Sequence, residues 1–144
     1  PAPRVACQKR SPMRQKPVLE AADCAKIMAA AKAKAAEMGW AVTIAVVDDG
    51  GVPLHLERID GALVMSATVA VEKARSAAVT RNSTKVAEDV VAKRPGTAAL
   101  PRITVQGGLP ILVGKDCVGA VGVSGVQSHA DEEVAAAGIA ALGL

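Results

Sequence analysis

VQGGLPILVGKDCVGAVGVSG, residues 105–125, contains the clearest strand and turn pattern of the chain, and the predicted fold is built around it. Runs of Val, Ile and Leu on either side of its Gly-Lys-Asp turn predict two adjacent antiparallel strands, 109–113 and 117–124. The second run contains Gly119 and Gly122, although glycine weakens a strand interior. These glycines therefore indicate a close backbone approach, a bulge or a ligand lying on the sheet.

Apolar segments upstream of this stretch predict the remaining strands. Residues 41–48, AVTIAVVD, place apolar side chains on both faces, which is typical of a central strand. After the tight-turn sequence Asp-Gly-Gly, residues 52–58 return as a second strand. Pro53 cannot donate to a ladder and so favours an edge position for it. With a short strand at 103–105, we expect an antiparallel sheet of about five strands.

Alanine-rich segments predict helices packed on this sheet, because alanine is the best helix former. The predicted helices span residues 18–38, 63–80, 85–93 and 131–142. In the first, a stripe at helical spacing predicts the buried face; it comprises Val18, Ala21, Ala22, Ala25, Met28, Ala29, Ala33 and Ala36. The second carries a face of small residues, with Lys73 in the same ladder; the face comprises Ser66, Ala67, Ala70, Ala74 and Ala77. The fold class is therefore α/β (α+β), with one domain over residues 18–144.

The charge of the chain is concentrated at its start. The net charge is +3 over 144 residues. Residues 1–17 contain no acid and five of the basic residues, which are Arg4, Lys9, Arg10, Arg14 and Lys16. The remainder has 12 Lys and Arg against 14 acids, a net charge of −2. We interpret residues 1–17 as a flexible, solvated basic tail rather than a nucleic-acid-binding arm.

The cysteines and the hydropathy limit the class of protein. Cys7, Cys24 and Cys117 are far apart and form no C-x-x-C pair, so a zinc or thioredoxin-like site has no support. Reduced thiols, and a tail without the apolar region of a signal peptide, lead us to expect a cytoplasmic protein. No apolar run approaches the roughly 18 residues of a membrane helix, so we expect no membrane partner.

Several residues are candidates for holding a small anionic metabolite. Lys73 is unusual on a small-residue face: it either snorkels to solvent or points into a pocket. Together with Arg58 and the amides of Gly107 and Gly108, its amine offers a carboxylate site. A buried lysine can also act as a base, which makes Lys73 the candidate catalytic residue of an enzyme.

Acidic residues near the C-terminus form a second group of candidates. Asp131 and Glu132 begin the last predicted helix, where acids favour the helix dipole. They are also candidate ligand-binding residues, which could hold a metal ion or protonate a substrate. The sequence shows no serine-hydrolase elbow and no phosphate loop.

The motifs taken together resemble a known family. VTIAVVDDGGVPLHLERIDGA, AVEKARSAA, STK, RPGTAALPRITVQGGLPILVGKDCVGAVGVSG and DEEVAAAGIAALG follow one another in the expected order. This set is similar to the GlcG/HbpS-like haem-binding-protein family, which includes the C-terminal domain of PduO-type proteins. The resemblance covers residues 18–143. It implies a profilin-like fold with a five-stranded antiparallel sheet, and homo-oligomers from dimer to octamer. Some members bind haem or iron, and others are encoded in catabolic operons.

Haem requires an apolar slot and an axial ligand such as His, Met or Cys. Some members of the family ligate haem through a histidine on the first helix, where this chain has only Cys24 and Met28. The axial candidates are His55, otherwise an exposed edge-strand residue, and His129, otherwise a surface or capping residue. No metal site beyond haem is predicted.

These observations and the resemblance lead to one expected function with an alternative. The first is a cytoplasmic, homo-oligomeric small-molecule-binding protein that takes haem or an anionic metabolite and is accessory to a catabolic pathway. The alternative is an isomerase or lyase acting on a small carboxylate, with Lys73 as base or anchor.

Overall fold

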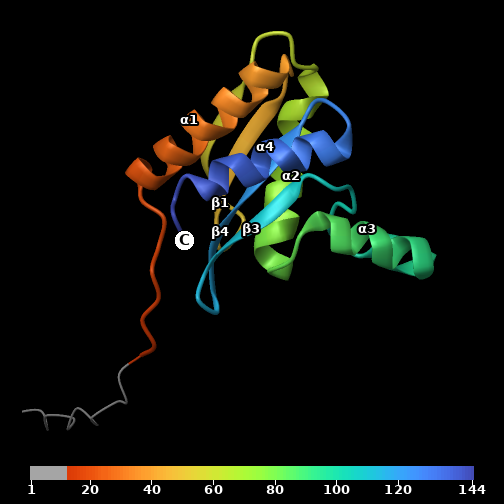
Figure 1. The fold of residues 1–144 in the computed structure, drawn as a ribbon. Helices are drawn as coiled ribbons and strands as arrows, with labels where there is room; N and C mark the ends of the chain where they lie inside the picture. The colour runs from red at the N-terminus through yellow and green to blue at the C-terminus, as the bar shows by residue number, and fades with distance from the viewer. Residues whose placement is uncertain (1–12) are drawn as a thin grey trace, which may run out of the picture.

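Helices cover both faces of an antiparallel sheet in the computed structural model, which describes residues 13–144 (Figure 1). Within these residues the strands are β1 (Thr43–Asp48), β2 (Pro53–Arg58), β3 (Gly108–Val113) and β4 (Asp116–Ser124). The helices are α1 (Ala21–Met38), α2 (Val64–Thr80), α3 (Thr84–Lys93), α4 (Ser128–Ala140) and the 3-10 helix η1 (Pro95–Ala99). Most of the predicted basic tail, residues 1–12, lies outside the described part of the chain.

The strand order is β2-β1-β4-β3, with every neighbouring pair antiparallel. The hairpin predicted from residues 105–125 is confirmed as β3 and β4. The central position of β1 and the edge position of β2, which begins at Pro53, are confirmed as well.

The prediction of a fifth strand at residues 103–105 is wrong, and residues 13–144 form a sheet of four strands. The backbone N–H of Ile103 donates to the Ser76 hydroxyl on α2 at 2.8 Å, instead of to a neighbouring strand. The carbonyl of Gly107 then accepts from Val123 N at 2.9 Å, and the ladder begins one residue later. Apolar residues alone did not make a strand here because helix α2 supplies a competing partner.

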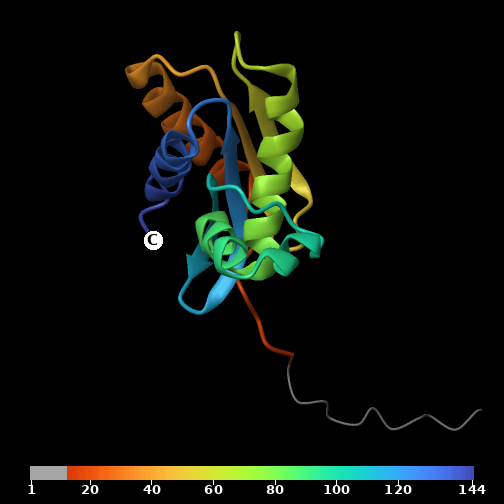
Figure 2. The same ribbon diagram turned by 90° about the vertical axis from the view of Figure 1, so that its right-hand side faces the viewer.

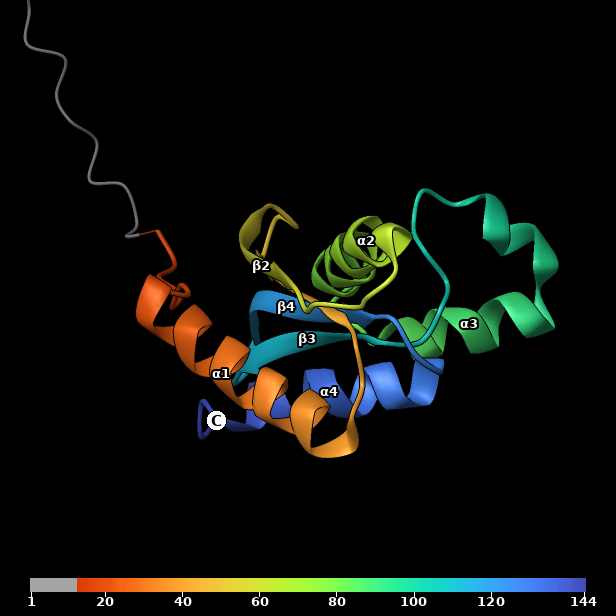
Figure 3. The same cartoon turned by 90° about the horizontal axis from the view of Figure 1, so that it is seen from above.

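The helices form two layers around the sheet. Seen from above, α1 and α4 lie on one side of β3 and β4, and α2 lies on the other (Figure 3). The view turned about the vertical axis shows the same separation and places α3 beside the lower end of α2 (Figure 2). No helix in residues 13–144 has the length and apolarity needed to cross a bilayer.

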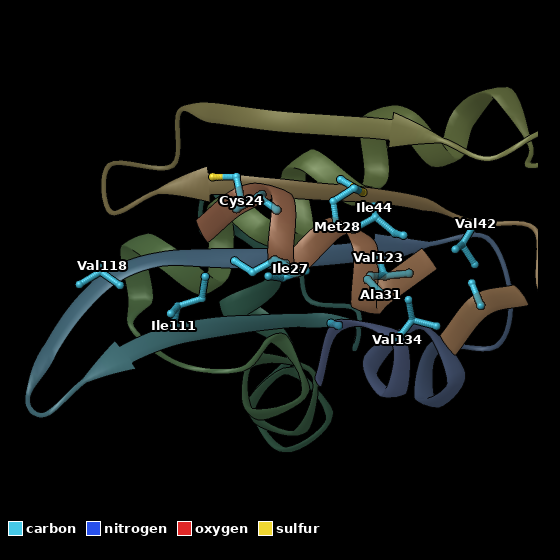
Figure 4. Close-up of a cluster of buried hydrophobic side chains, with 14 residues drawn as sticks. Cys24, Ile27, Met28, Ala31, Val42, Ile44, Ile111, Val118, Val123 and Val134 are labelled. Carbon is cyan, nitrogen blue, oxygen red and sulfur yellow. The ribbon is translucent and has the colours of Figure 1, made fainter. Parts of the chain in front are cut away.

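The layer of α1 and α4 contains the larger core cluster, built from branched side chains (Figure 4). The face that α1 buries comprises Cys24, Ile27, Met28, Ala31 and Ala35. Of the predicted stripe only Met28 is buried, so that prediction is wrong. A helix with alanine on every side has no distinct apolar stripe, and the few large side chains decide which face packs.

The α2 layer packs against the sheet through small residues. A Cβ atom added to Gly122 on β4 would lie 2.1 Å from the carbonyl oxygen of Ala70 on α2, whereas one added to Gly119 would lie 2.4 Å from the carbonyl oxygen of Val47 on the neighbouring strand β1. Of the three roles expected for these glycines, close backbone approach is observed at Gly122. Gly119 adjoins an irregularity in the ladder, where β4 pairs Gly119 with Ile111 but Cys117 with Leu112, as in a β-bulge. The buried residues of α2 include Ser66, Ala70, Ala74 and Ala77, which confirms most of its predicted face.

Candidate functional site

Lys73 on α2 is buried beside the start of β3 and the end of β4, where its amine reaches α4. Its side chain is 2% exposed, and Nζ donates to Asp131 Oδ2 at 2.8 Å and to the carbonyl of Val123 at 3.0 Å. Asp131 in the first turn of α4 is equally buried. The snorkelling interpretation of Lys73 is therefore wrong. Its amine is held by a partner from the opposite layer, and a role as base or ligand anchor stays a prediction.

The two predicted glycines pack against this pair. A Cβ atom on Gly107 would lie 2.7 Å from Lys73 Nζ, and the residue has a positive φ of 127°. Gly108 N donates to Thr84 Oγ1 at 2.9 Å, so this amide already has a partner. The structure brings Lys73 together with Gly107 and Gly108, as predicted, in closely packed surroundings. It also adds Asp131, which was predicted as part of a separate group, and it leaves Arg58 out.

Burial raises the pKa of the Asp131 carboxyl, while the hydrogen bond and charge of Lys73 act in the opposite direction. The second carboxylate oxygen accepts from Val126 N at 3.1 Å. The adjacent Glu132 has one buried oxygen, Oε2, without a hydrogen-bond partner among the described residues. No three His, Cys, Asp or Glu side chains within residues 13–144 are grouped so that they could hold a metal ion.

Arg58 lies in a different place, at the rim of a cavity of about 320 Å³ between α1 and the end of β2. The residues that line this cavity, named here the indole cavity, are Lys32, Ala36, Trp40, Glu57, Arg58, Ile59 and Asp60. Of these residues, only Arg58 was a predicted site residue. Trp40 was the available signal, because it is the only aromatic residue of the chain and directly follows the glycine that ends α1.

Two further cavities are mostly apolar. The first, named here the aliphatic cavity, has a volume of about 240 Å³ and lies between the start of α1, the β3–β4 hairpin and the C-terminal residues. Its lining consists of Pro17, Val18, Leu19, Asp23, Lys26, Val113, Val118, Leu142 and Leu144. A hollow of about 440 Å³ beside η1 is lined by Arg94, Pro95, Gly96, Thr97 and Leu100. The aliphatic cavity is lined by three separate segments of the chain, which explains why no single motif predicted it.

None of the candidate haem ligands lines any of these three cavities. His55 is half-buried on β2 opposite Val46, and His129 is exposed in the first turn of α4. Cys24 and Met28 are 3% exposed within the core. Burial raises the pKa of the Cys24 thiol, which disfavours the thiolate that iron would bind. The apolar lining of the aliphatic cavity thus suits contact with one part of a porphyrin, whose whole macrocycle exceeds the cavity volume of about 240 Å³, and it supplies no axial ligand for the iron.

Comparison of the sequence with known proteins identifies a matching family and similar proteins. The model of the family described as "Haem degrading protein HbpS-like" matches residues 19–140. Protein GlcG of Escherichia coli strain K12 is 40% identical over 114 residues, which are 78% of this chain and 85% of GlcG.

Solved structures agree with this relationship. A double mutant of Streptomyces reticuli HbpS superimposes with a TM-score of 0.85 at 31% identity, covering 92% of each chain. A structure described as a PduOC:Heme complex superimposes with a TM-score of 0.80 at 27% identity, covering 87% of this chain and 95% of the other.

Proposed function

Because this chain belongs to the HbpS-like family, we propose that it is a small-ligand-binding protein whose first candidate ligand is haem. The relative that was solved as a complex with haem supports haem as the ligand. The apolar lining of the aliphatic cavity supports this cavity as the binding site. We further propose that the protein is accessory to a catabolic pathway, as the resemblance implies.

The relative whose described complex contains haem is the single observation that carries the haem proposal, and the aliphatic cavity offers an apolar place for part of the macrocycle. Seven of its nine lining residues are apolar, and Lys26 adds a cation that suits a propionate. The hollow beside η1 is larger, but one short segment forms it, so it contacts a flat ligand from one side only. Since no axial ligand lines the aliphatic cavity, the proposal concerns binding and assigns no chemistry to the iron.

Titration of the purified protein with haemin, followed by the Soret absorbance, tests this function. We expect a saturable shift of the band. Val18→Trp should weaken binding about tenfold, because Val18 lines the cavity yet is 67% exposed and can be enlarged without disturbing the core. Val79→Trp is the matched control, since Val79 is 55% exposed and lines none of the three cavities.

The outcomes separate binding from its location. Absence of any band shift at saturating haemin rejects haem as the ligand. An equal loss in both Trp variants rejects the aliphatic cavity as its place. His55→Ala and His129→Ala in the same titration test the two axial candidates, because loss of the iron ligand would move the Soret maximum.

We also propose that the protein is a homo-oligomer, as the resemblance implies. An apolar surface supports this proposal: Val52, Leu54, Leu56, Leu63, Val64 and Met65 on or beside β2 and the start of α2 are 43–76% exposed. An apolar patch of this kind is typical of protein–protein contact. Native mass of the purified protein should exceed that of one chain, and a mass of 14.5 kDa at micromolar concentration would contradict the proposal.

A further inference from the structure

The indole cavity has a rigid frame. Helix α1 ends at Gly39, which has a left-handed φ of 69°, and the next amide, Trp40 N, donates to the carbonyl of Ala35 at 2.9 Å. On the opposite wall Ile59 N donates to Val42 O at 3.0 Å and so ties the loop after β2 to the sheet. The positions of Trp40 and of the residues after β2 are therefore fixed by the backbone, and the cavity is formed before any ligand arrives.

Four charged residues line this cavity: two form an ion pair with each other, and two have no ion-pair partner among residues 13–144. Lys32 Nζ donates to Glu57 Oε1 at 2.6 Å and bridges α1 to β2. Within residues 13–144, neither Arg58 nor Asp60 has an ion-pair partner. The cavity thus combines one available guanidinium and one available carboxylate with the only indole of the chain.

We propose that the indole cavity binds a small zwitterion that carries both a carboxylate and an ammonium group. The guanidinium of Arg58 matches the two oxygens of a carboxylate. The carboxylate of Asp60 pairs with the ammonium group, and the Trp40 ring contacts the apolar part of the ligand. A volume of about 320 Å³ is at the lower end of ligand pockets and suits a molecule of amino-acid size.

The charges of the lining favour a zwitterion over a simple anion. Two cationic and two anionic side chains line the cavity, so its formal charge is balanced. A dianion would meet Glu57 and Asp60 as well as the cations, and would gain little. This inference goes beyond the proposed haem function, because the indole cavity and the aliphatic cavity share no lining residue.

Trp40 makes the proposal directly measurable. The chain contains one Trp, no Tyr and no Phe, so its intrinsic fluorescence reports on this cavity alone. We would titrate the full chain with L-leucine while recording emission and, independently, heat. 4-Methylpentanoate lacks the ammonium group of leucine, and 3-methylbutylamine lacks its carboxylate. Glycine betaine carries both charges with a quaternary ammonium group, and distinguishes an amino acid from a betaine as the preferred zwitterion.

We expect at least one of the two zwitterions to bind saturably, and both singly charged analogues to bind about tenfold or more weakly, because each leaves one charged partner unpaired. Arg58→Gln and Asp60→Asn should weaken binding of the zwitterion by a similar factor. Both residues are exposed, so these variants should fold. Arg94→Gln, at an exposed arginine that lines the hollow beside η1, should leave binding unchanged.

Three results would overturn the proposal. The first is the absence of emission change and heat for both zwitterions at 10 mM (about the weakest binding expected of a metabolite site). The second is binding of 4-methylpentanoate as tight as that of L-leucine, which would make the site an anion site. The third is an equal loss of binding in Arg94→Gln, which would place the ligand elsewhere.

Discussion

The molecule contains two lysine–carboxylate ion pairs, one exposed and one buried. The exposed pair has the shorter distance, yet the buried pair should contribute more to stability. Lys32 and Glu57 are 2.6 Å apart, with side chains 43% and 40% exposed. Lys73 and Asp131 are 2.8 Å apart, with both side chains 2% exposed. Water competes for the charges of the first pair and screens their attraction, but cannot reach the second. Exposure rather than distance therefore decides how much each pair matters to the fold.

Each member of the buried pair also has a second hydrogen-bond partner. Val123 O is a second acceptor for Lys73, and Val126 N a second donor to Asp131, so the pair is embedded in a network that joins α2 to α4. The exposed pair lies at the rim of a cavity whose other charges lack partners. The Lys73–Asp131 network therefore connects elements of the fold, whereas Arg58 and Asp60, the unpaired charges beside the indole cavity, are available to a ligand.

The largest effect should follow from Lys73→Met. Removal of one partner leaves the Asp131 carboxylate buried without its cation, so the free energy of unfolding should fall by about 3–5 kcal/mol. Urea denaturation followed by circular dichroism measures the change. A loss below about 1 kcal/mol would show that water reaches the pair, and would make its amine accessible to a substrate.

A smaller effect should appear in the pH dependence of the same variant. Burial raises the pKa of Asp131 above 3.8, and the loss of Lys73 removes the opposing influence. A carboxyl whose folded-state pKa lies above its unfolded value stabilises the fold below the unfolded pKa, and that contribution is lost as pH rises through the folded pKa. Lys73→Met should therefore be closest to the wild type near pH 4 (about the unfolded pKa) and fall behind toward pH 8, by about 1.4 kcal/mol for each unit of raised pKa. Melting temperatures across this range test the sign, and a deficit that shrinks toward pH 8 would contradict it.

The smallest effect should come from Lys32→Met, the matched change in the exposed pair. Because both side chains reach water, the free energy of unfolding should change by less than about 1 kcal/mol, and added salt should reduce the difference further. The same urea titrations measure it. A loss comparable to that of Lys73→Met would remove the distinction between the two pairs.

The sheet could be predicted where a local pattern and its tertiary surroundings agree. The β3–β4 hairpin follows from a Gly-Lys-Asp turn between apolar runs, and Pro53 correctly indicates an edge strand. Residues 103–105 have the composition of a strand, but Ser76 on α2 binds the amide of Ile103. That competition arises only in three dimensions, so the sequence could not exclude the fifth strand.

The candidate site divides in the same manner. An unusual lysine on a small-residue face identified Lys73 as special, yet its partner Asp131 lies 58 positions further along the chain, and no spacing rule links them. Arg58 was grouped with Lys73 because both are cationic, whereas in the structure Arg58 lines a different cavity together with Trp40. The chemistry that each side chain could perform was predictable from the sequence, but the partners of Lys73 and Arg58 in the folded chain were not.

The contact of α2 with Gly122 bears on how this molecule can move. A helix that rests directly on the main chain of a strand, without an intervening layer of side chains, cannot rock or slide without a clash. Helix α2 and β4 must therefore shift as a rigid body. Any rearrangement that accompanies ligand capture is left to the opposite layer, where α1 meets the sheet through long, rotatable side chains such as Met28 and Ile27.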